Sequence, residues 1–296
     1  MYTTTSTLAT IALAATAVFA QCDHGTPFYK RQQEEGANNA ENSVGTFTDP
    51  GFDYGATRGP VLWHTLDPAN AACAEGRRQS PIDLTEAIQV APAGTLNMTI
   101  DSTSNTTLIN LGTTVELEVH GTTVIGNESF GLAQFHYHTP SEHYLLGEHF
   151  PAEVHFVHES IDNPGNFLVV GFVIEPTDTD GDALMDGVLE NLASVPNPGD
   201  DLPLTSLNFD PILGLINDGE FFTYGGSLTT PPCSEVVTFY ISKSPIQLRD
   251  PLYNALRRMV GHNSRYIQSQ PGSENLLQLA GLGKRDLEIK ASINLG

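Results

Sequence analysis

The chain has 296 residues, 40% of them hydrophobic, and a formal net charge of −22. This composition is typical of a folded protein with enough apolar side chains for a core. The strong negative charge argues against nucleic acid and anionic membranes as partners, because both carry the same sign of charge.

The N-terminus has the features of a secretory precursor. An apolar run of about ten residues, too short to span a bilayer, ends at Ala20 with small residues spaced as a signal peptidase requires. We therefore expect a signal peptide over 1–20, although its first residues lack lysine and arginine. The dibasic pair ending at Arg31 predicts a propeptide over 21–31, unless it is only a solvated charge pair. Residues 32–50 are polar with few large apolar side chains, which predicts a flexible leader.

The rest of the chain predicts one mainly β (α+β) domain over 51–285, with 286–296 as a C-terminal tail. Short alternating segments separated by Gly, Pro and Asn predict strands, and few helices are expected. The predicted strands are 115–119, 134–138, 153–158, 167–174 and 236–241, and the predicted helices are 182–192 and 250–260. For the second helix the signal is Asp250 as N-cap, followed by proline at the first helical position.

Three Asn-x-Ser/Thr sequons begin at Asn97, Asn105 and Asn127, and they predict glycosylation on an exposed face, although such sets also arise by chance. The chain has three cysteines, an odd number for an exported protein. Cleavage after the dibasic pair would remove Cys22 and leave Cys73 and Cys233.

Three histidines on two predicted strands form a candidate metal site. Alternate residues of a strand share a face about 6–7 Å apart, so His136 and His138 point the same way, and a paired strand could add His155. Three imidazoles give zinc one open position, which is typical of catalytic sites. Gln134 and Glu153 lie on the same faces as their neighbouring histidines and could orient them. The alternative is that some of the ten histidines are merely solvated or packed in the core.

Five motifs resemble those of the alpha-class carbonic anhydrases. Residues 224–235, Tyr-Gly-Gly-Ser-Leu-Thr-Thr-Pro-Pro-Cys-Ser-Glu, are similar to the substrate loop of that family. Residues 59–64 and 78–83 are similar to its two N-terminal signatures, and 263–265 to its late Asn-x-Arg element. Together with the histidine strands, they occur in the family's order along most of the chain. The resemblance implies a secreted eukaryotic member, with a single domain built on a large, twisted, mostly antiparallel central sheet and zinc at the base of a conical cleft.

The resemblance also implies roles for individual residues. Thr229 is similar to the residue that accepts a hydrogen bond from zinc hydroxide and donates its own proton to a buried carboxylate, here Glu142. A hydroxyl has only one proton, so this pair would admit a nucleophile that carries a proton and reject an anion without one. The implied zinc ligands are His136, His138 and His155, the implied second shell is Gln134, Glu153, the Asn263 carbonyl and the active-site Tyr54, and the implied substrate pocket is Val157, Val169, Leu228, Thr230 and Val237.

For the pocket residues, alternation alone favours ordinary core packing, and without the resemblance Thr229 and Glu142 are loop residues. In exported family members, cysteines at the positions of Cys73 and Cys233 form a disulfide, so this pairing is implied here. It would close a loop of about 160 residues and hold the segment that carries Thr229.

The chain departs from the family pattern at three places, of which the first bears on speed. Thr113 stands at the proton-shuttle position, where fast members have a histidine, and threonine does not titrate. Another histidine, such as His64 or His120, or external buffer must then carry the proton, or turnover is limited. Phe239 replaces the pocket tryptophan of many members, and 139–141 reads Thr-Pro-Ser instead of Trp-Gly-Ser.

These features predict a secreted carbonic anhydrase that uses Zn²⁺ and a zinc hydroxide nucleophile to hydrate carbon dioxide reversibly to bicarbonate and a proton. The expected partners are these small molecules, with no nucleic acid and no membrane anchor. The alternative is a catalytically silent relative with a binding or storage role, but such relatives typically lose a zinc ligand. A zinc protease is disfavoured because the His-Glu-x-x-His motif is missing from the sequence, while weak ester hydrolysis remains a conceivable side activity.

Overall fold

A computed structural model describes residues 48–101 and 106–282 of the chain. The predicted signal peptide 1–20, propeptide 21–31, most of the leader 32–50, the tail 286–296 and Asn105 therefore lie outside the described residues. Of the predicted domain 51–285, residues 102–105 and 283–285 lie outside them.

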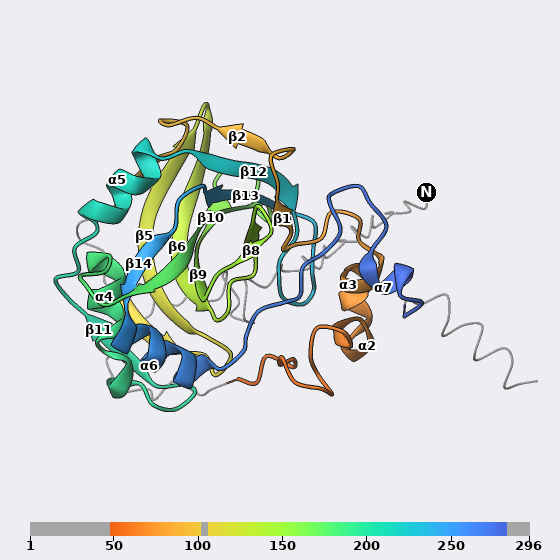
Figure 1. Ribbon diagram of the computed structural model, residues 1–296, viewed down its shortest axis with the longest axis horizontal. Helices are drawn as coiled ribbons and strands as arrows, with labels where there is room; N and C mark the ends of the chain where they lie inside the picture. The colour runs from red at the N-terminus through yellow and green to blue at the C-terminus, as the bar shows by residue number, and fades with distance from the viewer. Residues whose placement is uncertain (1–47, 102–105, 283–296) are drawn as a thin grey trace, which may run out of the picture.

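A large sheet dominates the described part of the chain (Figure 1). Its strands follow the order β11-β4-β5-β6-β9-β10-β13-β12-β2, while β3 also pairs with β5 and β14 with β10. All pairings are antiparallel except those of β10 with β13 and β14. The expected mostly antiparallel central sheet is thus confirmed. Its strands are β2 (Gln89–Ala91), β3 (Asn97–Ile100), β4 (Thr106–Asn110), β5 (Val115–Ile125), β6 (Glu128–His138), β9 (Ala152–Ser160), β10 (Phe167–Thr177), β11 (Asp201–Leu204), β12 (Phe221–Gly226), β13 (Val237–Ser242) and β14 (Ile246–Arg249).

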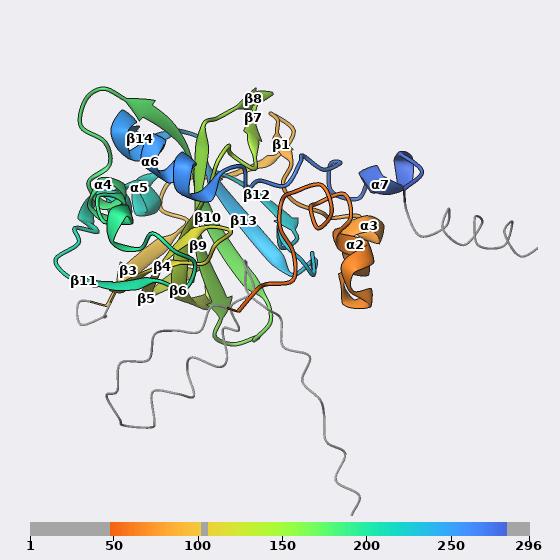
Figure 2. The ribbon, with the colours of Figure 1, turned by 90° about the horizontal axis from the view of Figure 1, so that it is seen from below.

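Short helices and a small second sheet surround the large one (Figure 2). The small sheet has the order β1-β7-β8. Its strands are β1 (Asp83–Leu84), β7 (Tyr144–Leu145) and β8 (Glu148–His149); the helices are α2 (Trp63–Leu66), η2 (Pro68–Ala71), α3 (Ala72–Glu75), α4 (Ala183–Leu189), η3 (Leu192–Ser194), α5 (Asp210–Asp218), α6 (Asp250–Val260) and α7 (Leu276–Leu279). None of the helices within the described ranges is long and apolar enough to cross a membrane.

The two faces of the large sheet carry separate apolar clusters. The larger cluster packs α4, α5 and α6 against one face and includes Val154 and Phe156 of β9. The smaller cluster lies on the other face and includes Val157 and Phe239. Strands covered on both faces have almost no exposed residues, and β9 and β10 follow this pattern. The alternation expected along β9 is confirmed, because Val154 and Phe156 belong to one cluster and Val157 to the other.

All the predicted strands and helices are present, but most of them begin or end at other residues than predicted. All five predicted strands exist, and β5 and β6 extend well beyond the predicted ranges because their alternation continues through less apolar residues. Asp182 caps α4 by accepting bonds from Leu184 and Met185 backbone N–H groups, but that helix ends at Leu189 rather than 192. The prediction that Asp250 caps α6 was wrong, since Asp250 is its first residue and the cap is Arg249. Helix α5, which also begins with Asp-Pro, was missed.

Candidate metal centre

Two neighbouring strands bring the three predicted ligands together. His136 on β6 lies directly opposite His155 on β9, and His138 follows on the same face of β6. All three imidazoles are fully buried. One ring nitrogen from each lies within 4.8 Å of the others, and the Nε2 atoms of His136 and His138 are 3.2 Å apart. Two nitrogens bound to one tetrahedral zinc at about 2.0–2.1 Å are roughly 3.3 Å apart, so this donor set fits zinc.

The second nitrogen of each ring is held by a hydrogen bond. Nδ1 of His136 lies 2.9 Å from Gln134 Oε1, and Nδ1 of His138 lies 2.9 Å from the Asn263 carbonyl oxygen. Nε2 of His155 lies 2.7 Å from Glu153 Oε1. Each acceptor fixes the proton on that nitrogen, which leaves the lone pair of the other nitrogen for a metal. The structure thus gives the predicted orienting residues the contacts that their role requires.

Glu153 holds other groups in place besides His155. Its Oε1 also accepts from His143 Nδ1 at 2.7 Å, and its Oε2 accepts from the backbone N–H groups of Glu142 and His143 at 2.7 and 2.8 Å. Burial raises the pKa of this carboxyl, but the charges and hydrogen bonds of His143 and His155 outweigh it and hold the pKa well below its usual value. Glu153 is therefore an ionised carboxylate that accepts four hydrogen bonds.

Sequence reasoning missed His143 and the groups behind it. Nε2 of His143 lies 2.6 Å from the Tyr224 hydroxyl, which lies 2.9 Å from Ser80 Oγ. His143, Glu153 and His155 form a second histidine–carboxylate group close enough for a metal, but their facing atoms already bond to one another. His143 stood within the histidine-rich run, yet it follows the strand in a turn where alternation no longer assigns a face.

Gly171 leaves the space that the third ligand needs. It lies opposite His155 on β10, where an added Cβ would come within 3.2 Å of the His155 ring and 2.6 Å of Ile241. A side chain at this position would therefore force Ile241 to move and would press on the His155 ring. The row across the sheet is Glu116, His136, His155, Gly171 and Ile241.

The next row carries two of the five predicted substrate-pocket residues, Val157 and Val169. Gln134, Val157, Val169 and Phe239 lie side by side across β6, β9, β10 and β13. The Phe239 ring centroid lies 6.1 Å from that of His155, so the apolar residues of this row border the candidate metal site. Val157, Val169, Leu228 and Val237 are buried in the smaller apolar cluster, and Thr230 is also buried.

Glu142 lies against the ligands. Its Oε1 accepts from the backbone N–H of Arg265 at 2.9 Å, and its Oε2 lies 3.5 Å from His138 Nε2 and 4.0 Å from His155 Nδ1. The Thr229 hydroxyl is buried and has no hydrogen-bond partner among the described residues. The bond from Thr229 to Glu142 stays a prediction. A buried hydroxyl without a protein partner is also what a site for a water or hydroxide requires.

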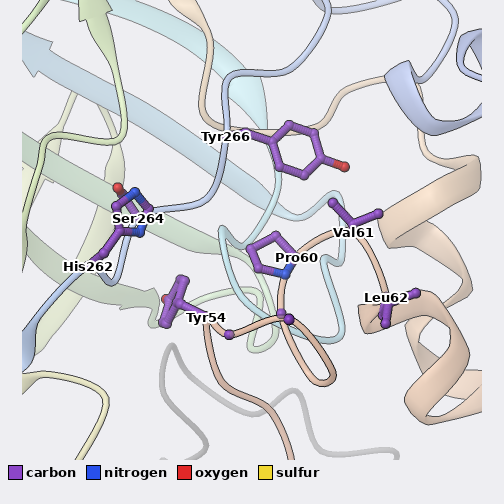
Figure 3. A pocket seen from close by; sticks show the side chains of 10 residues that line it. Tyr54, Pro60, Val61, Leu62, His262, Ser264 and Tyr266 are labelled. Carbon is purple, nitrogen blue, oxygen red and sulfur yellow. The ribbon is translucent and has the colours of Figure 1, made fainter.

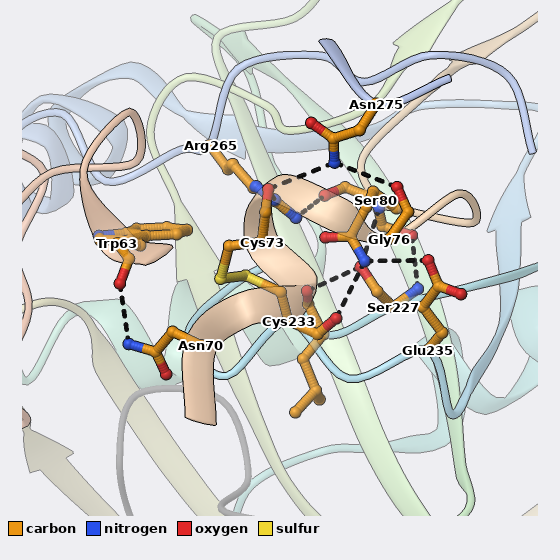
Figure 4. The surroundings of a disulfide bond; sticks show 12 residues. Trp63, Asn70, Cys73, Gly76, Ser80, Ser227, Cys233, Glu235, Arg265 and Asn275 are labelled. Atoms are coloured by element: carbon orange, nitrogen blue, oxygen red, sulfur yellow. Dashed lines mark hydrogen bonds between the residues drawn. A yellow bond between two sulfur atoms is a disulfide. The ribbon is translucent and has the colours of Figure 1, made fainter. Parts of the chain in front are cut away.

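The predicted disulfide between Cys73 and Cys233 is confirmed, with an S–S distance of 2.05 Å (Figure 4). It joins α3 to the turn that follows Thr229. The buried Arg265 guanidinium donates to the carbonyls of Ser80 and Cys73 at 2.8 and 3.2 Å. Because the Arg265 backbone also holds Glu142, the disulfide region supports both members of the predicted pair.

The remaining predicted residues lie at the edges of the site or on the surface. The carbonyl of Thr113 accepts from the Asn263 side chain at 2.9 Å, so Thr113 neighbours the group that orients His138. Tyr54 lines a cavity with His262, Ser264 and Tyr266 (Figure 3). The sequon residues Asn97 and Asn127 are exposed, and glycosylation remains a prediction.

Comparisons with known proteins agree with this geometry. Residues 58–289 match the family described as eukaryotic-type carbonic anhydrase. A carbonic anhydrase of Nostoc sp. is 32% identical over 217 residues, covering 71% of this chain and 79% of the relative. Alpha carbonic anhydrase 7 of Arabidopsis thaliana is 32% identical over 232 residues, covering 75% and 81%. The solved fungal alpha carbonic anhydrase of Aspergillus oryzae is similar with a TM-score of 0.74 and 37% identity, covering 78% of this chain and 98% of that one.

Proposed function

The chain belongs to the eukaryotic-type carbonic anhydrase family and is a carbonic anhydrase; we propose that it hydrates carbon dioxide reversibly at a zinc ion held by His136, His138 and His155. The observation that carries this proposal is the convergence of three imidazole nitrogens, one from each histidine. The other nitrogen of each ring is already hydrogen-bonded, to Gln134, Asn263 or Glu153.

Zinc bound by three histidines, as is known for carbonic anhydrases, lowers the pKa of a water to about 7 and so supplies hydroxide near neutral pH. The protein's part is to hold three neutral imidazoles at fixed angles. Gln134 and Glu153 do this from the same strands as their ligands, and the Asn263 carbonyl does it from a distant segment.

Thr229 and Glu142 select the nucleophile in this proposal. An ionised Glu142 only accepts hydrogen bonds, so it commits the Thr229 proton and leaves the Thr229 oxygen as an acceptor. A nucleophile with a proton can then donate to Thr229, while an anion without one is disfavoured. Two features support the assignment: the Thr229 hydroxyl is buried, and the Glu142 carboxylate lies beside His138 and His155.

The substrate pocket is formed by apolar residues of the smaller cluster beside the ligands. Carbon dioxide has no net dipole, so an apolar surface can bind it without favouring water or ions. Val157 and Val169 are paired neighbours on β9 and β10, and Leu228 and Val237 belong to the same cluster. We assign substrate contact to these four residues and to Thr230.

We further propose that the enzyme is secreted after removal of 1–20 and 21–31, and that it carries glycan at its sequons. The disulfide is compatible with an oxidising compartment, and Asn97 and Asn127 are exposed. Intact-mass analysis of the secreted protein should show an N-terminus at or after Gln32. A mature chain that retains Cys22 would contradict this processing.

Stopped-flow measurement of carbon dioxide hydration tests the function. The purified protein should contain about one zinc per chain, lose hydration activity on chelation and regain it with zinc. A protein that binds zinc fully but does not hydrate carbon dioxide would support the silent, ligand-binding alternative. Ester hydrolysis, if present, should disappear with the same chelator.

A further inference from the structure

Hydration releases one proton per turnover, and position 113 cannot carry it. Threonine does not titrate in the physiological range. The backbone of Thr113 nevertheless touches the segment that follows α6, because its carbonyl accepts from the Asn263 side chain. A histidine, His262, comes immediately before Asn263 and is exposed.

Most other histidines of the described residues are buried or hydrogen-bonded to another group. His136, His138, His143, His155 and His158 are fully buried. Burial lowers the pKa of His64. His149 bonds to the Ser141 carbonyl and stacks on Tyr144 in the small sheet. The other two histidines of the described residues, His120 on β5 and His262, are exposed.

A cavity of about 260 Å³ connects His262 with the predicted active-site tyrosine (Figure 3). The residues that line it include Tyr54, Ser264 and Tyr266 as well as His262, together with Pro60 and Val61. A water molecule takes roughly 30 Å³, so the cavity has room for several waters. His120 does not line this cavity.

We propose that His262 receives the proton released by hydration, through water in this cavity, and passes it to buffer in the solvent. The inference rests on the proposed function of the site. The reaction water gives up one proton, which adds to a ring nitrogen of neutral His262 and makes an imidazolium. A buffer base then removes that proton and restores the neutral imidazole, so no other reactant is needed.

The test compares His262→Ala with wild type by stopped-flow hydration at low and high buffer. At low buffer, kcat should fall by on the order of ten- to hundredfold, because proton removal limits saturated turnover. kcat/KM should remain unchanged, since it reports the attack on carbon dioxide, and added imidazole should restore kcat. The matched control His149→Ala removes an exposed imidazole that does not line the cavity, and it should change neither constant.

A second measurement uses the zinc-free protein, so it does not depend on activity. Imidazole should bind saturably to zinc-free His262→Ala, shifting the NMR signals of Tyr54 and Ser264, and should not do so in wild type, where the side chain occupies the place. Failure of imidazole to bind there would overturn the proposal.

Other outcomes separate this inference from the proposed function. A wild-type protein without hydration activity would refute the function itself. Normal kcat in His262→Ala, or the same loss in His120→Ala instead, would overturn only the role of His262. A parallel fall of kcat and kcat/KM would show that His262 supports the ligands through Asn263, and would also overturn it.

Discussion

Replacing Glu153 with Gln should weaken zinc binding without unfolding the protein. The substitution keeps the size of the side chain but converts an acceptor-only carboxylate into an amide with one acceptor and two donor protons. In the structure both oxygens accept: Oε1 from His143 and His155, and Oε2 from two backbone N–H groups. No orientation of an amide satisfies all four.

The two orientations of the amide have different costs. If its NH₂ group faces the rings, His155 must accept at Nε2 and carry its proton on Nδ1, the nitrogen that faces the candidate metal position. If NH₂ faces the backbone, two buried N–H groups lose their acceptor, at about 1–3 kcal/mol each. The protein adopts the cheaper state, and loss of such an orienting partner typically weakens metal binding by about 10–100-fold, or about 1.4–2.7 kcal/mol.

Competition titration against a chromophoric chelator measures this change in zinc affinity, and thermal unfolding of the zinc-free protein reports the fold. Glu159→Gln is a matched control, because Glu159 lies on the same strand and, within the described part of the chain, its side chain accepts only from the Gly165 backbone. It should leave zinc affinity unchanged. A Glu153→Gln protein that binds zinc within about threefold of wild type would refute the argument from tautomers and buried donors.

Three further predictions concern other buried residues. His138→Ala should remain folded but lose zinc and hydration, measured by metal content and stopped flow, because two imidazoles remain in a site for three; full zinc would contradict the ligand assignment. Thr229→Ala should keep zinc but lose on the order of a hundredfold in kcat/KM, and an unchanged rate would mean that Thr229 is only structural. Burial lowers the pKa of His158 from 6.5 to about 4, so between these pH values only the unfolded state binds a proton at His158. The zinc-free protein should therefore lose about 3 kcal/mol of unfolding free energy as the pH falls from 6.5 to 4. Urea titrations across this range should show the loss, and it should be absent in His158→Gln.

The sequence predicted best what two-residue periodicity determines. Alternation placed His136 and His138 on one face, and both orienting residues two positions from their ligands lie on the same strand. It could not identify the bond from His138 to the Asn263 carbonyl, 125 residues away, without the family resemblance. His143 and Tyr224 were missed for the same reason, since their contact joins a turn to a strand 81 residues later.

The site therefore depends on two kinds of support. Gln134 and Glu153 orient ligands from the central strands, whose hydrogen bonds persist as long as the sheet does. Glu142 depends instead on Arg265, whose guanidinium bonds to the carbonyl of disulfide-bonded Cys73. The chain-entropy model gives a cross-link over 160 residues about 5 kcal/mol of stabilisation, and that cross-link joins segments outside the central strands. Loss of the disulfide should then disturb the Thr229 segment and Glu142 before it disturbs the zinc ligands. In the protein without this disulfide, the hydration rate should fall at a denaturant concentration where zinc is still bound.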